Sequence, residues 1–287
     1  AHVYFELEVQ SPDLAAIERA INGLIERHEA LRTLPAEDGS QRVLAAAPHW
    51  ELPVHERAEL AEIRRSLAHS ATPGEQWPLF HVSAVRLDGE RYCFPVKFDL
   101  LIGDLHAMRL LVKEFLTLYA GNSLPDSHPR PSLRQFAEAG MQTLPSTDAS
   151  AYWLNRLPAF PPAPELPVRL SENVEDREFV RRQGRLGAAQ TQLFEARCRA
   201  IGVSPSAALV ALYGAVLATW STNTRFTVNL PILDRSSNPG SDSVVGDFTS
   251  VLPVVMDLTD GDSFAALAAA TQRQLWLDLQ HASFSGI

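Results

Sequence analysis

The sequence has little cysteine and no long apolar run, and both absences exclude classes of site. Only two of the 287 residues are cysteines, Cys93 and Cys198, and neither lies in a CxxC pair or beside a pair of histidines. A structural zinc site is therefore not expected, and two isolated thiols fit a reducing cytoplasm, although a single disulfide stays open. No apolar stretch approaches the roughly 20 residues that a membrane-spanning helix needs. We therefore expect no membrane partner.

The chain also lacks an excess of positive charge. It has 25 Lys and Arg against 34 Asp and Glu, a formal net charge of −9, whereas binding to a phosphate backbone needs clustered basic residues. The notable basic cluster is interrupted by Glu178 and Phe179, and consists of Arg177, Arg181, Arg182 and Arg185. No nucleic-acid partner is expected. A phosphate-binding glycine loop and a GxSxG sequence are also absent, which argues against a phosphate-loop nucleotide site and a serine hydrolase.

The composition is that of a globular protein, with 46% hydrophobic and 21% charged residues. Apolar spacing and capping residues predict helices, and alternation predicts strands, in an interleaved order. The predicted helices cover Asp13–Leu31, Leu105–Tyr119, Ser132–Thr143, Asp148–Leu157, Ala188–Ile201, Ser204–Ser221 and Ser263–His281. The predicted strands cover Ala1–Leu7, Leu79–Leu87, Tyr92–Phe98, Phe179–Leu186, Arg225–Leu230 and Val251–Leu258. We expect Asp88-Gly89 to form a hairpin turn and Pro95 to mark an edge strand or a bulge.

A proline-rich stretch divides the sequence. It resists helix formation and predicts an extended connector, and its prolines are Pro158, Pro161, Pro162, Pro164 and Pro167. We place the first lobe at residues 1–157, the connector at 158–170 and the second lobe at 171–287. The strands and helices on both sides predict two α/β sandwiches. This fold class by itself indicates no function.

Two aspartates enclose an apolar run where a predicted strand meets a predicted helix. Asp99 and Asp104 are separated by Leu100–Gly103. This pattern predicts a partly buried turn, in which the carboxylates need partners. In the structural interpretation Asp104 caps the helix that follows and Asp99 pairs with an arginine.

Two further segments carry polar groups in apolar surroundings. Val245–Ser250 contains Asp247, and its structural interpretation is a Gly-Asp turn that precedes a strand. Thr227 and Asn229 fall on one face of an otherwise apolar strand. Polar residues at such positions either form hydrogen bonds within the core or line a cavity.

Several segments form an ordered set. They are Arg27–Arg32 (RHEALR), Asp99 to Asp104 (DxxxxD), Tyr152–Leu157 (YWLNRL) with Pro164–Pro167 (PELP), Val245–Ser250 (VGDFTS), and Gln274–Leu279 (QLWLDL) with His281 and Phe284–Gly286. Each motif is weak alone, but the ordered set resembles the heterocyclization domains of nonribosomal peptide synthetases. The resemblance implies an α/β fold, namely the two-lobed pseudodimer of the chloramphenicol acetyltransferase type, here expected to be truncated at both ends.

The resemblance implies different roles for Asp99 and Asp104. Condensation domains carry HHxxxDG where this subclass carries DxxxxD, so Asp99 takes the place of the first histidine and Leu100 that of the second, functional one. Leu100 cannot transfer a proton, which excludes a condensation mechanism that relies on this histidine. In the wider superfamily the aspartate of the motif commonly pairs with an arginine. Asp104 is therefore expected to hold its loop in register.

The implied reaction needs no cofactor bound to the chain, because the substrates travel on the phosphopantetheine arms of carrier proteins. The amine of a carrier-bound Cys, Ser or Thr attacks an acyl thioester, and its side chain then closes a five-membered ring with loss of water. We expect Asp247 to be the acid–base residue, since a carboxylate in an apolar loop can hold a proton near neutral pH. Thr227 and Asn229 are expected to orient Asp247 or the amide oxygen, with Thr219 as a substitute for Thr227.

The implied partners are upstream donor and downstream acceptor carrier proteins and an adjacent adenylation domain, all in the cytoplasm. We expect the Asp99–Asp104 loop and the Asp247 loop to meet at a tunnel between the lobes. Two other functions remain open. A non-catalytic condensation-like scaffold would fit the missing histidine, although the intact DxxxxD and GDFTS signatures argue against it. A stand-alone acyltransferase of the chloramphenicol acetyltransferase type shares the fold but needs a histidine at Leu100.

Overall fold

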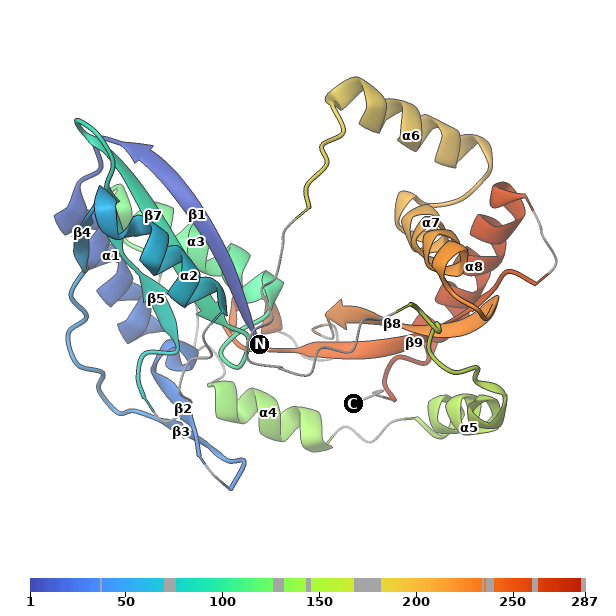
Figure 1. The fold of residues 1–287 in the computed structure, drawn as a ribbon. Helices are drawn as coiled ribbons and strands as arrows, with labels where there is room; N and C mark the ends of the chain where they lie inside the picture. The colour runs from blue at the N-terminus through green and yellow to red at the C-terminus, as the bar shows by residue number, and fades with distance from the viewer. Residues whose placement is uncertain are drawn as a thin grey trace. The chain divides into compact units, whose positions relative to one another are not determined.

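The chain forms two compact units in the computed structural model (Figure 1). The structure describes residues 1–36, 38–69, 76–125, 132–142, 146–167, 182–233, 235, 240–259 and 263–284. Unit 1 consists of Ala1–Thr143 and Leu233–Thr249, and unit 2 consists of Leu144–Ile232 and Ser250–Ile287. Both units combine helices with strands, which confirms the predicted mixed α/β class.

Unit 1 is built on a sheet whose centre is the strand β7. Its strands are β1 (His2–Gln10), β4 (Val54–Glu56), β5 (Phe80–Val82), β6 (Ala84–Arg86) and β7 (Arg91–Asp99). β1 runs antiparallel to β7 along its whole length, from the pair His2 and Asp99 to the pair Gln10 and Arg91. β5 and β6 pair with the other side of β7, and β4 is parallel to β6. A separate two-stranded sheet joins β2 (Thr33–Pro35) to β3 (Gln41–Val43).

The two faces of this sheet are covered by different helices. The helical elements of unit 1 are α1 (Leu14–Arg27), η1 (Glu29–Arg32), η2 (Arg57–Glu59), α2 (Leu60–His69), α3 (Leu105–Tyr119), α4 (Leu133–Gln142) and η4 (Ser241–Ser243). The main core joins Leu24 of α1 and Leu111 of α3 to Phe94 and Phe98 of β7. Because side chains alternate along a strand, Cys93 points to the opposite face. There it packs with Leu60 of α2.

Unit 2 pairs two strands with a helical layer. Its elements are α5 (Thr147–Arg156), η3 (Leu157–Ala159), α6 (Ala188–Ala200), α7 (Pro205–Trp220), β8 (Arg225–Leu233), β9 (Thr249–Asp257) and α8 (Phe264–Gln280). β8 pairs with β9. The core joins Phe226 of β8, Leu252 and Met256 of β9, Leu275 of α8 and Trp153 of α5. Within the described residues no single helix is long and apolar enough to span a membrane. The bent pair formed by α6 and α7 together has the length and the apolar composition of a span, and nothing else indicates one.

The structure differs from the predicted elements in unit 1: α2 and the short strands β2, β3 and β4 were not predicted, and two predicted elements have other bounds. The first predicted helix ends at Arg27, because His28 is extended, and Glu29–Arg32 forms a separate 3-10 turn. The predicted strand Leu79–Leu87 is interrupted at Ser83, whose N donates to the carbonyl of Pro95 (3.3 Å). Pro95 has no N–H to return to Ser83. Pro95 of β7 therefore lies opposite the break between β5 and β6. The expected edge strand is wrong, because β7 has neighbouring strands on both sides.

Other expectations concern the middle of the chain. Residues 179–181 of the predicted strand Phe179–Leu186 lie outside the described residues, and residues 182–186 are not a strand. The predicted lobe boundaries stay a prediction, and the compact units have different bounds. α5 groups with unit 2 because Trp153 packs against Phe226 and Leu275. The two cysteines are free, buried thiols.

Candidate functional site

The turn between β7 and α3 is held by both of its aspartates. Asp99 is the last residue of β7, and its carboxylate accepts a hydrogen bond from Leu101 N (3.0 Å). Asp104 is the N-cap of α3 and accepts a hydrogen bond from Ala107 N (2.8 Å). Both side chains are buried, with 5% and 2% of each residue exposed. The helix-capping interpretation of Asp104 is confirmed, whereas an arginine partner for Asp99 is not found among the described residues.

Asp104 forms a buried ion pair with Arg235. Nη2 of Arg235 lies 2.9 Å from both carboxylate oxygens of Asp104, and both side chains are almost fully buried. The carboxylate also accepts a hydrogen bond from Phe248 N (3.1 Å), and Asp104 N donates to Gly246 O (3.2 Å). A single carboxylate therefore joins the start of α3 to Arg235 and to the GDFTS segment.

Arg235 organises the loop that leads to this segment. It donates hydrogen bonds to the carbonyl oxygens of Ser241 (2.8 Å), Val244 (2.8 Å) and Gly246 (3.1 Å). Its guanidinium lies 4.3 Å from the centre of the Phe248 ring. Arg235 Nε is buried without a hydrogen-bond partner in the described part of the chain. A planar guanidinium with a fixed fork of donors suits such a set of acceptors.

The structure brings together two of the predicted loops within unit 1. The Asp99–Asp104 turn and the Gly246–Phe248 segment are joined through Asp104, as predicted for the two loops themselves. The fit is tight at Gly246, where an added Cβ would lie 2.8 Å from Leu133 Cδ1 and 3.0 Å from the Phe248 ring. Glycine is therefore required at this position of the motif for steric reasons.

Asp247 points away from this buried set. It is exposed, and its carboxylate accepts a hydrogen bond from Thr249 N (3.0 Å). The expectation of an apolar setting for Asp247 is therefore wrong for unit 1 taken by itself. The neighbouring Gly246 and Phe248 supply the contacts to the buried set through their backbone O and N atoms, while Asp247 itself is exposed.

Thr227 and Asn229 belong to unit 2. Thr227 Oγ1 donates to Pro161 O (2.7 Å), and Thr227 N donates to Pro162 O (2.8 Å), so the proline-rich segment runs alongside β8. Asn229 is exposed. Thr219, the alternative to Thr227, donates to Ala215 O within α7 (3.0 Å). The proposed action of these residues on Asp247 stays a prediction.

A second buried ion pair lies in unit 2 and joins two of the motifs. Asp278 of α8 is fully buried and accepts hydrogen bonds from Tyr152 (2.6 Å) and Gln274 (2.8 Å), and it also pairs with Arg156. Burial and the Asp278 carboxylate raise the pKa of Tyr152 to about 12. The ring of His281 stacks on Tyr152 at 4.0 Å. The YWLNRL and QLWLDL motifs thus form one structural cluster.

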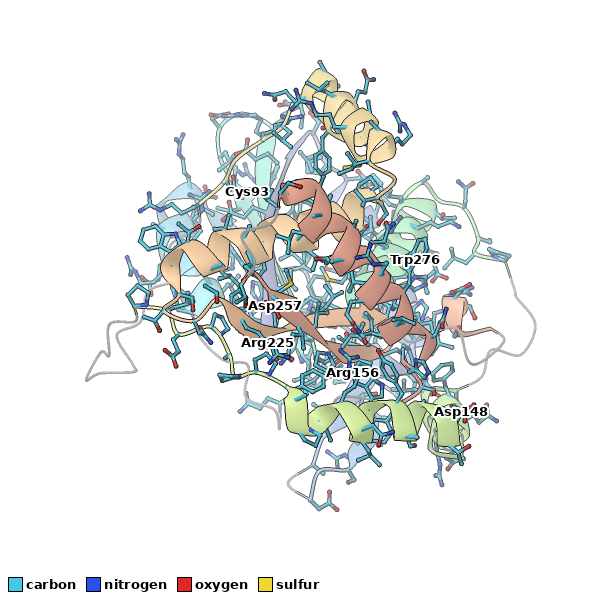
Figure 2. The ribbon with its side chains drawn as sticks, turned by 90° about the vertical axis from the view of Figure 1, so that its right-hand side faces the viewer. Cys93, Asp148, Arg156, Arg225, Asp257 and Trp276 are labelled. Atoms are coloured by element: carbon cyan, nitrogen blue, oxygen red, sulfur yellow. The ribbon has the colours of Figure 1, made fainter. Side chains whose placement is uncertain are left out.

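Each unit contains an open cavity. The cavity of unit 2 has a volume of about 290 Å³ and is lined by Arg156, Phe160, Arg225, Asp257 and Gln274, among others. The charged members can be followed in Figure 2, where Arg225 lies beside its ion-pair partner Asp257. The cavity of unit 1 is smaller, about 170 Å³, and is lined by Arg27, His28, Arg32 and Val244, among others.

Residues of the RHEALR motif line this smaller cavity, and two of them contact the buried Glu114 of α3. His28 Nε2 lies 2.7 Å from Glu114 Oε2 of α3, and Arg27 Nε lies 3.1 Å from the same oxygen. The motif therefore fastens the end of α1 to α3, the helix that Asp104 caps. Among the described residues no group of His, Cys, Asp and Glu could hold a metal ion.

Sequence reasoning did not identify Arg235 as the partner of Asp104. The resemblance implied an arginine but did not say which one. The available signal was the position of Arg235, five residues after the predicted strand Arg225–Leu230 and ten residues before Val245 of the VGDFTS segment. That position alone does not distinguish it from the other arginines of the chain.

Comparisons with known proteins match the whole chain. The Condensation domain family model matches residues 2–284. The chain is 32% identical over 302 residues to phenyloxazoline synthase MbtB of Mycobacterium tuberculosis, covering 100% of the chain and 21% of MbtB. It is 29% identical over 290 residues to pyochelin synthetase PchF of Pseudomonas aeruginosa, covering 96% of the chain and 16% of PchF. The chain therefore spans about a fifth of the length of these relatives.

Solved structures of similar fold include parts of two nonribosomal peptide synthetases. The cyclization-docking bidomain of EpoB, a nonribosomal peptide synthetase from Sorangium cellulosum, has a TM-score of 0.86 at 26% identity, covering 98% of the chain and 59% of that structure. The nonribosomal peptide synthetase FmoA3 has a TM-score of 0.86 at 30% identity, covering 99% of the chain and 30% of that structure. With the motifs in order and the family model matched from end to end, the chain belongs to the condensation-domain family.

Proposed function

We propose that the chain is a heterocyclization domain of a nonribosomal peptide synthetase. The observation that carries the proposal is the turn from Asp99 to Asp104, in which Leu100 stands where a condensation domain has its functional histidine. Asp104 anchors this turn to the GDFTS segment through Arg235 and Phe248 N. The names of the similar proteins, a phenyloxazoline synthase and a cyclization domain, support the same function.

The proposed reaction has two stages. The amine of a carrier-bound Cys, Ser or Thr attacks the acyl thioester, which forms an amide and releases the thiol of the donor carrier. The side-chain thiol or hydroxyl then adds to the amide carbonyl carbon. This addition closes the ring, and the former carbonyl oxygen takes the proton of the thiol or hydroxyl. The oxygen then gains a second proton and leaves as water, the nitrogen loses its proton, and the new C=N bond completes the thiazoline or oxazoline. No net oxidation or reduction occurs.

The two stages make different demands on the protein. A thioester is already reactive, so amide formation mainly needs the two substrates held together. Loss of water needs a positioned proton donor and acceptor. We assign this proton transfer to Asp247, which is accessible on the GDFTS segment, with Thr227 and Asn229 orienting it or the amide oxygen. Asp104 is a positioning residue, because its carboxylate is occupied by Arg235 and by two backbone N–H groups.

The proposal implies partners that the chain does not itself contain. The substrates arrive on the phosphopantetheine arms of an upstream donor and a downstream acceptor carrier protein, and an adenylation domain is expected nearby. The proposed reaction requires no cofactor bound to the chain. The cytoplasmic location stays a prediction, as does a tunnel that receives both arms.

The test is a time course with loaded donor and acceptor carrier proteins, analysed by mass spectrometry. The ring product is lighter than the linear amide by one water. Asp247→Asn keeps the shape of the side chain and removes its proton chemistry, so the linear amide should accumulate while ring formation falls by about 100-fold or more. Asp104→Asn should depress both stages together. The exposed Asp242 provides the matched control, and Asp242→Asn should leave both stages unchanged.

Three outcomes would contradict the proposal in different ways. Equal loss of both products in Asp247→Asn would refute the role of Asp247. Formation of amide without any ring by the unaltered chain would refute heterocyclization. Absence of both products, with the carriers still bound, would indicate the scaffold function instead.

A further inference from the structure

The open cavity of unit 2 is lined by one face of α8. Leu267, Ala270, Thr271 and Gln274 all border it, and their spacing of three and four residues places them on the same side of that helix. The other lining residues come from β8, β9, α5 and the segment that follows α5, and none of them has a part in the proposed reaction. The volume is about 290 Å³. Sites for drug-sized ligands measure roughly 300–1,000 Å³, so this cavity suits a small molecule.

Thr271 is the first residue of the cavity that points to a ligand. It is buried, with 6% of the residue exposed, and it lines the cavity. A threonine within a helix commonly returns its hydroxyl to the carbonyl four residues earlier, and Thr117, Thr191 and Thr219 all do so in this chain. The hydroxyl of Thr271 forms no hydrogen bond with any other residue that the structure describes. Because a buried hydroxyl without a partner is costly, a polar group in the cavity is expected to bind it.

Arg156 contributes free hydrogen-bond donors to the same cavity. Its Nη1 donates to the Tyr152 hydroxyl (2.6 Å) and pairs with the buried carboxylate of Asp278. The centres of the Tyr152 and Phe160 rings lie 4.9 Å and 5.3 Å from the guanidinium carbon. Nε and Nη2 have no partner among the described residues, and 25% of the side chain is exposed. The guanidinium is therefore fixed in place with one edge open.

α8 brings these two features together. Gln274 lies three residues after Thr271, on the next turn of the same helix face. Its amide donates to the Asp278 oxygen that also pairs with Arg156 (2.8 Å). The Arg156 guanidinium is thus held at the turn of α8 that follows Thr271, and both side chains border one cavity.

The chain shows twice what this edge of an arginine binds. Arg64 donates through Nε and Nη2 to the two carboxylate oxygens of Glu6 (2.8 and 2.7 Å). Arg91 does the same to Asp88 (2.8 and 2.6 Å). The planar fork of donors matches the two oxygens of a carboxylate. The open edge of Arg156 is suited to the same group.

The charges around the cavity favour a ligand with a single negative charge. Arg225 pairs with Asp257 at 3.4 Å, and both line the cavity together with Arg156 (Figure 2). Each arginine thus already has one carboxylate, Asp257 for Arg225 and Asp278 for Arg156. A doubly charged group such as phosphate would be repelled more strongly by these carboxylates. The apolar lining residues are Ala159, Phe160, Val255, Leu267 and Ala270. A carboxylate on an apolar body matches both properties.

We propose that this cavity binds a small organic monocarboxylate: its oxygens accept hydrogen bonds from the open edge of Arg156 and from the Thr271 hydroxyl, and its apolar body packs on Leu267 and Phe160. The site gives the YWLNRL and QLWLDL motifs a second role, because their buried cluster around Asp278 positions Arg156. It is additional to the proposed reaction and does not depend on it.

The first experiment measures binding with 4-fluorobenzoate as the probe. 4-Fluorobenzamide is its uncharged counterpart of nearly the same shape, and ¹⁹F NMR titration of the chain gives a dissociation constant for each. Ligands of about ten non-hydrogen atoms reach dissociation constants of about 1 mM or lower when their contacts are good. We expect saturable binding of 4-fluorobenzoate in that range. 4-Fluorobenzamide should bind at least about 10-fold more weakly, because it cannot accept a charge-assisted pair of hydrogen bonds.

The second experiment removes the hydroxyl of Thr271. Thr271→Val nearly keeps the shape of the side chain and deletes a group that has no partner among the described residues, so the free energy of unfolding should not fall. The affinity for 4-fluorobenzoate should decrease by about 5- to 10-fold. Thr191→Val is the matched control, because Thr191 is also helical but lies outside the cavity. It should leave the affinity unchanged. Arg156→Lys keeps the charge and removes the planar fork, and it should weaken binding by about 10-fold or more.

The position of the probe is read from nuclear Overhauser contacts between its ring protons and the methyl groups of Leu267. Equal binding of the acid and the amide, or no saturable binding of 4-fluorobenzoate up to about 10 mM, would overturn the proposal. Full affinity in Thr271→Val, or Overhauser contacts only to residues outside the cavity, would overturn it as well. No carrier protein and no turnover are needed, so the result is independent of whether the chain forms rings.

Discussion

Replacing Arg235 by methionine should destabilise unit 1 far more than the same change at an exposed arginine. The change leaves the carboxylate of Asp104 buried with two backbone N–H donors and no counter-charge. It also removes hydrogen bonds from the guanidinium to three backbone carbonyls and its contact with the Phe248 ring. Loss of one partner of a buried ion pair costs about 3–5 kcal/mol. We expect a decrease of that size in the free energy of unfolding.

The control is Arg225→Met. Arg225 pairs with Asp257 at 3.4 Å, but about half of each side chain is exposed, at 48% and 54%. Exposed pairs contribute roughly 0–1 kcal/mol, so this variant should unfold at nearly the urea concentration of the unaltered chain. Both variants are compared by urea denaturation followed by circular dichroism, with amide hydrogen exchange to locate the loss in unit 1. The reasoning is wrong if Arg235→Met and Arg225→Met lose equal stability.

A double variant tests the cause of the loss. Asp104→Asn removes the charge that Arg235→Met leaves uncompensated. The chain with both changes should therefore be more stable than Arg235→Met alone, by about 1–3 kcal/mol. If the double variant is less stable than either single variant by the sum of their losses, the ion pair is not the reason for the destabilisation.

Two further predictions concern acid stability and the tight fit of the GDFTS segment. Hydrogen bonds from Arg64, with one from Tyr4, lower the pKa of Glu6 from 4.5 to about 2, so its stabilising contribution is present above pH 4.5 and is lost as the pH falls toward 2; Glu6→Gln should reduce that pH dependence by about 2 kcal/mol in urea titrations, after allowance for the solvent around Arg64. Gly246→Ala should cost about 1–3 kcal/mol and displace the Phe248 ring, and an unchanged ¹H NMR environment of that ring would contradict the steric argument.

Local signals in the sequence predicted most of the longer helices, because the residues at a helix end cap it or stop it, whereas α2 (Leu60–His69) was not predicted. α3 begins after Asp104, whose carboxylate caps it, and ends before the left-handed Gly121, as its flanking residues indicated. The break in the first predicted helix was missed, since Glu29–Arg32 has the same apolar spacing as the helix before it. What differs is the extended backbone of His28, whose side chain is bound to Glu114 from another helix.

The candidate site was harder to predict because its contacts are distant in the sequence. Asp104 and Arg235 are separated by 131 residues, and no local pattern selects one arginine of the chain as the partner. The resemblance supplied the motif and the kind of contact, and the geometry supplied the residue. Within unit 1 the apolar setting expected for Asp247 is wrong: its neighbours in the sequence are apolar, but its own side chain is exposed.

The order of the chain gives the Asp104–Arg235 pair a consequence for synthesis. Unit 1 is discontinuous: its last segment, Leu233–Thr249, is made only after most of unit 2. At a rate of roughly 5–20 residues per second, the 131 residues between the two partners take on the order of 10 s to emerge from the ribosome. During that interval the nascent β7–α3 region contains a carboxylate whose partner does not yet exist. During translation, unit 1 can therefore form its buried ion pair only after Arg235 has been synthesised.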